Sequence, residues 1–127
     1  MSDPISDFLT QIRNGYLASK KEVSVHHSRM KEGLAQILCK EGFLKKFLRE
    51  KDSNRLVMRL AYYQQRPSVR KIKLVSKPGR KFYLHCREIA KFRSGMGRLI
   101  LSTSKGLMTD REALKKNLGG EVVCHIW

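Results

Sequence analysis

The sequence is organised around one stretch near its end, Ser102-Thr103-Ser104-Lys105-Gly106-Leu107-Met108-Thr109-Asp110. This stretch follows the apolar run Leu99-Ile100-Leu101, so we predict a strand over residues 98–103 that ends in a turn rich in hydroxyl groups. The turn should then lead into a short helix over residues 110–117. Small hydroxyl side chains beside a glycine allow another molecule to approach the backbone closely. We therefore expect this turn to be a contact surface.

Positive charge dominates the composition. The 127 residues include 27 Lys and Arg against 11 Asp and Glu, a formal net charge of +16. A field of this sign attracts polyanions, with nucleic acid as the first candidate and a membrane surface as the second. No apolar run approaches the roughly 18 residues of a spanning helix, and the N-terminus lacks a basic, apolar leader. We expect no membrane partner, and the three widely spaced cysteines indicate a reducing compartment.

The first 65 residues predict an N-terminal α+β module with two helices. Apolar residues spaced by three and four positions form one stripe over residues 3–15, with Gly15 as the expected stop. Ser28 should cap the second helix, and Gly42 should end it. The predicted buried face of the second helix comprises Met30, Leu34, Ile37 and Leu38.

Three predicted strands complete this module in the order helix, strand, helix, strand, strand. The first is the short segment 22–25. Segments 43–50 and 56–63 flank the turn-forming Asp52-Ser53-Asn54, which favours a hairpin. Paired apolar residues blur the alternation in 43–50, so a helix remains an alternative there. The polar, proline-containing stretch 64–68 then marks the boundary between modules.

Residues 66–127 predict a C-terminal module that is mostly β, with one short helix. A turn over residues 77–80 places Pro and Gly at type II positions. Thr109 and Glu112 have the spacing of a capping box at the start of the helix. Gly119-Gly120 indicates either a close backbone approach or a positive φ. The predicted strands cover residues 69–75, 82–84, 98–103 and 121–127. The predicted fold class is therefore α+β with two small modules.

Cations concentrate in residues 66–93. This segment has one acid, Glu88, and a net charge of +9, whereas residues 1–25 balance three acids against three bases. Solubility does not require charge to be localised in this way. Tyr83 follows two of the cations, which is typical of a ring that stacks on a nucleic-acid base, although a half-buried sheet tyrosine is the alternative. The ten cations are Arg66, Arg70, Lys71, Lys73, Lys77, Arg80, Lys81, Arg87, Lys91 and Arg93.

Two further sites in the first module carry polar residues that packing does not require. Arg13 and Asn14 fall at the end of the first predicted helix, where a solvated helix end is the alternative. Lys31 falls in the first turn of the second helix, where a cation opposes the helix dipole. This position favours an anion nearby, with a solvated lysine as the alternative.

The sequence lacks the patterns of catalytic and metal sites. Ser104-Lys105-Gly106 does not have the spacing of a P-loop, and no G-x-S-x-G nucleophile elbow is present. His85-Cys86 and Cys124-His125 are adjacent pairs. If both lie on strands, neighbouring side chains point to opposite faces, so each pair offers one metal ligand at most. We expect no enzyme activity, no cofactor, no metal ion and no small-molecule substrate.

Two segments resemble the C-terminal signature of the ribosomal protein S8 family of the small ribosomal subunit, in its bacterial or organellar form. They are the stretch 102–110 and Gly119-Gly120-Glu121-Val122-Val123-Cys124. The resemblance spans essentially the whole chain. The hairpin connection Asp52-Ser53-Asn54 is shorter than is usual in the family, and Leu107 and Trp127 also depart from the pattern. Other matching segments are Asp3-Pro4-Ile5-Ser6-Asp7-Phe8, Ile12-Arg13-Asn14-Gly15, Lys31, Glu41-Gly42-Phe43, and Ser76-Lys77-Pro78-Gly79-Arg80 with Tyr83.

The resemblance implies specific RNA-binding residues. Tyr83 would stack on a base or sugar, and Glu121 would order the loop and accept hydrogen bonds from RNA amino or hydroxyl groups. Arg80 would be among the cations that neutralise phosphates. The loop that enters the RNA minor groove would comprise Ser102, Thr103, Ser104, Lys105 and Gly106. The first module would contribute phosphate or sugar contacts from Arg13, Asn14 and Lys31.

The resemblance also implies a function. The chain would be a structural constituent of the small ribosomal subunit that binds the central domain of small-subunit (16S-type) rRNA and helps its assembly. The chemistry agrees, because the minor groove of A-form RNA is shallow and exposes 2′-hydroxyl groups. The expected partners are this RNA, neighbouring small-subunit ribosomal proteins and, as a further candidate, its own messenger RNA. The expected location is the ribosome of the cytoplasm, or of a chloroplast or mitochondrion. The alternative function is a translational regulator that binds an RNA hairpin.

Overall fold

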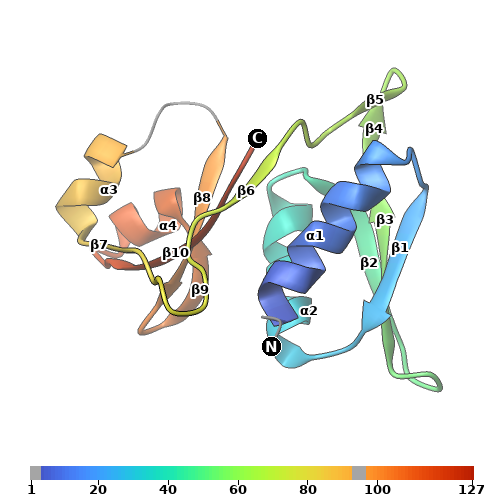
Figure 1. Cartoon of the computed structure of the whole chain (residues 1–127), viewed down its shortest axis with the longest axis horizontal. Coiled ribbons are helices and arrows are strands. Elements are labelled where there is room, and N and C mark those ends of the chain that lie inside the picture. Colours follow the sequence, from blue (N-terminus) through green and yellow to red (C-terminus); the bar gives the residue numbers. More distant parts are fainter. Residues whose placement is uncertain (1–3, 93–96) are drawn as a thin grey trace. The chain divides into compact units, whose positions relative to one another are not determined.

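The computed structural model describes residues 4–92 and 97–127. The chain forms two compact units, one up to Arg70 and one from Lys71 to Trp127 (Figure 1). Helices and strands are mixed in both units, so the predicted α+β class is confirmed.

The boundary between the units lies five residues later than predicted. β4 (Tyr62–Tyr63) and β5 (Arg66–Pro67) pair as a small hairpin, with Gln64 and Gln65 in the left-handed region at its tip. The N–H of Ser68 then donates to the carbonyl of Ala61. The polar stretch predicted as a linker is therefore a turn that belongs to the first unit.

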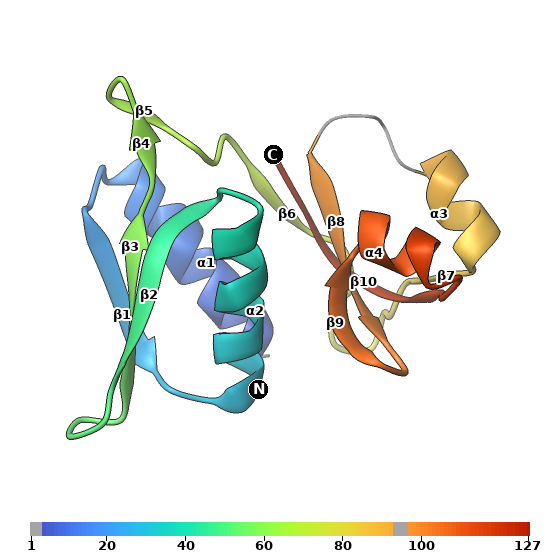
Figure 2. The same ribbon diagram turned by 180° about the vertical axis from the view of Figure 1, so that it is seen from behind.

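The first unit has the predicted order of helix, strand, helix, strand, strand. Its sheet is antiparallel in the order β1-β3-β2, and both helices lie against one face of it (Figures 1 and 2). Alternation explains this arrangement, because Leu56, Met58 and Leu60 are buried under the helices while Arg59 is exposed. The elements are α1 (Pro4–Leu17), β1 (Glu22–His26), α2 (Arg29–Lys40), β2 (Leu44–Glu50) and β3 (Arg55–Leu60).

Local signals set most of these boundaries. Ser28 caps α2 by accepting from the N–H of Lys31, and Gly42 follows the helix with a φ of 85°. Asn54 has a φ of 52° in the turn between β2 and β3, as a tight hairpin requires. Residues 44–50 of the segment 43–50 form the strand β2, so the helical alternative is wrong.

Two predictions about the helices of this unit are wrong. α1 runs through Gly15 to Leu17, because the glycine serves packing and does not end the helix: a Cβ there would lie 2.5 Å from Cγ2 of Val23 in β1. Met30 is 55% exposed, and the fully buried residues of α2 are Leu34, Ala35 and Leu38.

Tyr16 ties α1 to the two strands of the hairpin. Its hydroxyl donates to the carbonyl of Phe43, just before β2, at 2.5 Å, and accepts from the N–H of Ala61, just after β3, at 3.0 Å. Its ring contacts that of Tyr62 with centroids 5.6 Å apart. Burial raises the pKa of Tyr16 to about 12, so the phenol stays protonated and can donate.

We predict that Tyr16→Phe lowers the free energy of unfolding by about 1–3 kcal/mol, because it leaves a backbone N–H and a carbonyl without their partner. Urea titration followed by circular dichroism measures the change. Tyr63→Phe is the matched control, since Tyr63 is 73% exposed and its replacement should stay within about 0.5 kcal/mol. Equal losses in the two variants would contradict the role of Tyr16.

The second unit is a five-stranded antiparallel sheet with two helices on one face. Its strand order is β6-β10-β8-β9, and β7 pairs with the start of β10. Ile89 of α3 and Ala113 of α4 pack with Leu84, Leu101 and Val122 in one apolar core. The elements are β6 (Ile72–Leu74), β7 (Tyr83–Leu84), α3 (Cys86–Phe92), β8 (Arg98–Thr103), β9 (Gly106–Thr109), α4 (Asp110–Lys115) and β10 (Gly120–Ile126).

This unit corrects the prediction in two places. Residues 102–110 include the end of β8, the hairpin turn and β9, and are not a turn that leads directly into a helix. α4 begins after β9, where Thr109 accepts from the N–H of Glu112 as its cap. The helix α3 was not predicted, because its seven residues carry only one buried apolar side chain, Ile89, and so show no stripe.

The pair Gly119-Gly120 meets the predicted close backbone approach. A Cβ on Gly120 would lie 2.4 Å from the carbonyl oxygen of Ser102, and one on Gly119 would lie 2.5 Å from that of Leu84. Neither distance leaves room for a side chain. The two glycines therefore allow β10 to begin between β7 and β8.

Candidate nucleic-acid interface

The tip of the β8–β9 hairpin is held by the side chain of Thr103. Its hydroxyl donates to the carbonyl of Gly106 at 2.8 Å and accepts from the N–H of Lys105 at 3.2 Å. Gly106 has a φ of 108°, a conformation that favours glycine. Of the three hydroxyl groups at residues 102–104, that of Thr103 is thus hydrogen-bonded within the turn itself.

The other two hydroxyl groups remain available for a partner. Among the residues that the structure describes, neither Ser102 nor Ser104 has a side-chain hydrogen bond. Ser104, Lys105 and Gly106 are exposed, and Ser102 is half-buried. The space beside Gly106 is open, since a Cβ there would meet no atom within 4 Å.

Register places four side chains in one row across the sheet. Glu121 of β10 pairs with Tyr83 on one side and with Ser102 on the other, and Ser102 pairs with Leu107. Paired residues point to the same face of a sheet. Their neighbours Leu84, Leu101, Met108 and Val122 are buried under the helices, so the row lies on the opposite face. The structure therefore brings together the predicted residues Tyr83, Glu121 and Ser102.

The chemistry of the row is a ring, a carboxylate and a hydroxyl beside a cation. The Tyr83 side chain is 66% exposed, so the alternative of a half-buried sheet tyrosine is wrong. The Glu121 carboxylate lies 3.5 Å from Nζ of Lys81, a partly exposed ion pair. Sequence reasoning did not select Lys81, because a single lysine in a basic segment has no distinguishing signal.

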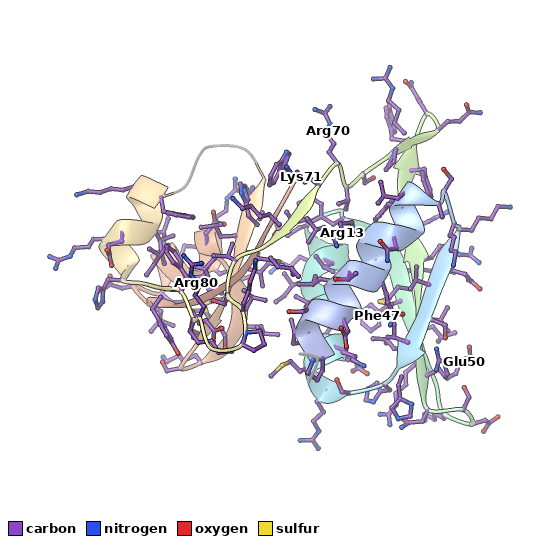
Figure 3. All side chains as sticks on the ribbon, in the orientation of Figure 1. Arg13, Phe47, Glu50, Arg70, Lys71 and Arg80 are labelled. Atoms are coloured by element: carbon purple, nitrogen blue, oxygen red, sulfur yellow. The ribbon has the colours of Figure 1, made fainter. Side chains whose placement is uncertain are left out.

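Arg80 lies in an ordered turn between β6 and β7 (Figure 3). Lys77 and Arg80 exchange backbone hydrogen bonds, and Gly79 has a φ of 77°, as the predicted type II turn requires. The buried Ser76 accepts from the N–H of Phe82 at 3.0 Å and closes the base of the turn. The Arg80 side chain is exposed to solvent.

The three predicted contact residues of the first unit are spread over its two helices. Arg13 lies on α1 (Figure 3). Its side chain is half-buried, and Asn14 next to it is exposed. Nζ of Lys31 donates to the carbonyl of His26 at 3.0 Å. This bond gives Lys31 a reason to occupy the first turn of α2, so its position no longer requires a nearby anion.

The charge of the second unit is strongly positive. Its described residues contain twelve Lys and Arg and four Asp and Glu, a balance of +8, and one of the acids, Asp110, is fully buried. Arg93, the last cation of the predicted basic segment, lies outside the described residues.

Nothing in residues 4–92 and 97–127 groups three or more possible metal ligands. Cys86 begins α3 and does not lie on a strand. Cys124 is buried in β10, and burial raises the pKa of its thiol to about 12. Within the same described ranges, no helix is long and apolar enough to cross a membrane.

Comparison with known proteins gives one consistent result. The family model described as Ribosomal protein S8 matches residues 3–127. A small ribosomal subunit protein uS8 of Nitratidesulfovibrio vulgaris is 46% identical over 127 residues, which cover 100% of this chain and 99% of that protein. The uS8 of Chromobacterium violaceum is 47% identical, over 98% of this chain and 96% of its own. The uS8c of Chlorella vulgaris is 46% identical, over 100% and 99%.

We predict that Thr103→Val speeds amide hydrogen exchange at Lys105 about fivefold, which corresponds to the loss of about 1 kcal/mol from one hydrogen-bonded turn. Valine keeps the shape of the side chain and removes only the hydroxyl. Ser104→Ala removes the neighbouring hydroxyl and should leave that exchange rate unchanged. The role of Thr103 would be contradicted by equal rates in the two variants, measured by NMR.

Proposed function

The chain belongs to the ribosomal protein S8 family, and on this premise we propose that it binds directly to the central domain of small-subunit rRNA and helps that domain to assemble. Members of this family are structural proteins of the ribosome, so the chain is a structural constituent of the small subunit and not an enzyme. The observation that carries the proposal is the row of Tyr83, Glu121 and Ser102 beside the exposed hairpin tip.

The hairpin tip suits the minor groove of A-form RNA. That groove is wide and shallow and lined by 2′-hydroxyl groups, which both donate and accept hydrogen bonds. Ser102 and Ser104 offer hydroxyl groups of the same kind. The open space beside Gly106 lets the RNA approach the backbone there. Lys105, exposed at the tip, is placed to neutralise a phosphate at the groove edge.

Glu121 favours binding in the minor groove of the RNA and not along its phosphate backbone. An ionised carboxylate only accepts hydrogen bonds and is repelled by phosphates. The minor groove offers the donors that it needs, namely 2′-hydroxyl groups and the amino group of guanine. Lys81, 3.5 Å away, reduces the cost of bringing this acid to an RNA surface. Glu121 would therefore direct binding to the minor groove of the RNA, while the cations would supply affinity.

The remaining contacts are assigned by their chemistry. The exposed ring of Tyr83 would stack on an unpaired base or a sugar, a contact worth roughly 1–3 kcal/mol when a base is involved. Arg80 would bind a phosphate. In the first unit, Arg13, Asn14 and Lys31 would contact phosphates or sugars. Neighbouring proteins of the small subunit are the remaining proposed partners.

The same surface also supports a second candidate function, the binding of an RNA hairpin in a message. Hydroxyl contacts in a minor groove read the shape of an RNA helix more than its sequence. A hairpin in the chain's own messenger RNA that had the shape of the rRNA site would therefore compete for Ser102, Ser104 and Glu121. Such competition would make the protein a translational regulator.

We expect the full chain to bind the central-domain rRNA helix more tightly than an unrelated duplex of equal length. Both affinities should fall as salt rises from about 50 to 200 mM, because phosphate contacts release counterions, but the ratio between them should persist. Filter binding or fluorescence anisotropy measures both. Equal affinities across the salt range would overturn the proposal.

We predict that Glu121→Gln weakens binding to the rRNA helix about tenfold and Ser104→Ala about fivefold, which reflects the loss of a charged and a neutral hydrogen bond. Neither variant should shift the melting temperature by more than a few degrees, since Ser104 is exposed and the ion pair of Glu121 with Lys81 is partly exposed. Ser53→Ala, in the exposed turn of the first unit, is the control that should leave affinity unchanged. If the loss of affinity instead follows loss of stability, these two residues are not RNA contacts.

A further inference from the structure

The second unit has a basic groove away from the proposed RNA-binding row. The groove has a volume of about 470 Å³ and lies between the edge strand β6, the turn over residues 77–80 and the end of α3. Its lining residues are Lys73, Leu74, Val75, Lys77, Arg80, Lys81, Phe82, Phe92 and His125. Among these described residues four are Lys or Arg, and none is an acid.

Register places this groove on the helix face of the sheet. Lys73 pairs with His125, which pairs in turn with Leu99 of β8. Leu99 packs in the core under the helices. Because Leu99 and Ser102 are three residues apart on one strand, their side chains point to opposite faces. The groove and the row that contains Ser102 therefore face different partners or different segments of one partner.

Two aromatic rings form one wall of the groove. Phe82 precedes β7 and Phe92 ends α3, and their ring centroids are 5.4 Å apart. At this spacing the rings contact each other, so a planar group can stack on their outer surface but cannot enter between them. They are 37% and 45% exposed, which is unusual for phenylalanine in a small domain.

We infer that this groove binds an unpaired nucleotide segment of RNA, with a base against Phe92 and Phe82 and the adjoining phosphates at Lys73, Lys77 and Arg80. The volume falls within the roughly 300–1,000 Å³ of small-ligand sites and is too small for a duplex. The cations outnumber the charges of one phosphate, which favours a polymer over a free nucleotide. Stacking beside cations is the usual chemistry of single-strand binding.

The inference rests on the proposed function in that it takes RNA as the partner, but it concerns a different surface. An acidic peptide with an apolar side chain is the competing occupant. Two residues belong to both surfaces. Lys81 lines the groove and also pairs with Glu121, and Arg80 lines the groove and is among the proposed rRNA contacts. For this reason both are left unchanged in the test.

The test measures binding of a fluorescent single-stranded pentauridylate to the full chain. Phe92→Ala should weaken binding about fivefold or more through loss of one stacked base, and Phe92→Tyr, which keeps a ring, should retain it. Lys73→Gln with Lys77→Gln should lower the slope of log affinity against log salt by about 1.4, at about 0.7 per phosphate contact on a single strand. Lys115→Gln with Lys116→Gln removes the same charge from the end of α4, outside the groove, and should leave the slope unchanged.

Photo-crosslinking then locates the base. A pentanucleotide that carries 5-iodouridine should crosslink to Phe92 or Phe82. Crosslinks confined to Tyr83, or equal affinity of Phe92→Ala and the original chain at unchanged melting temperature, would overturn the inference. Tighter, Phe92-dependent binding of a glutamate-rich peptide that contains tryptophan would overturn it in favour of a protein partner.

The two proposals fail separately in this design. The groove variants should keep their affinity for the rRNA helix, whereas Glu121→Gln should lose it and keep its affinity for pentauridylate. Failure of helix binding with intact pentauridylate binding would reject the rRNA proposal alone. Failure of pentauridylate binding with intact helix binding would reject the groove proposal alone.

Discussion

The close approach of three backbones at the start of β10 is the constraint on which the candidate site depends. Gly119 and Gly120 bring this strand against Ser102 on one side and Leu84 on the other, at distances that exclude any side chain. Only this approach places Glu121 between Tyr83 and Ser102. Two residues without side chains thus determine where three side chains of the candidate site meet.

The two candidate surfaces of the second unit share cations but differ in their other groups. Lys81 lies beside Glu121 in the row, and Lys73, Lys77 and Arg80 line the groove beside Phe92. Such cations would attract RNA without regard to its sequence. Under the proposed function, specific recognition would then come from the groups that differ between the two surfaces. The row offers a carboxylate and hydroxyl groups, which suit a groove with donors, and the basic groove offers rings, which suit an exposed base.

Sequence reasoning succeeded where one local signal decided the outcome. Ser28 capped α2, Asn54 formed the hairpin turn, and Gly79 took the positive φ of a type II turn. It failed at Gly15, which looked like a helix stop but is a packing glycine against Val23. It also missed that the hydroxyl of Thr103, a predicted RNA contact, holds the hairpin tip. Finding such uses requires knowledge of what lies opposite the residue in space.

The sequence by itself determined the α+β class, the positive charge of the second unit and the members of the hydroxyl-rich stretch, because composition and spacing along one chain carry these properties. The tertiary structure alone decided that Tyr83, Glu121 and Ser102 share one face, and that Lys73 and Phe92 line a groove on the other. Those relations depend on strand register and on a bulge in β10 between Val122 and Cys124. A shift of one residue there reverses which side chains face outward, and no local pattern in the sequence specifies it.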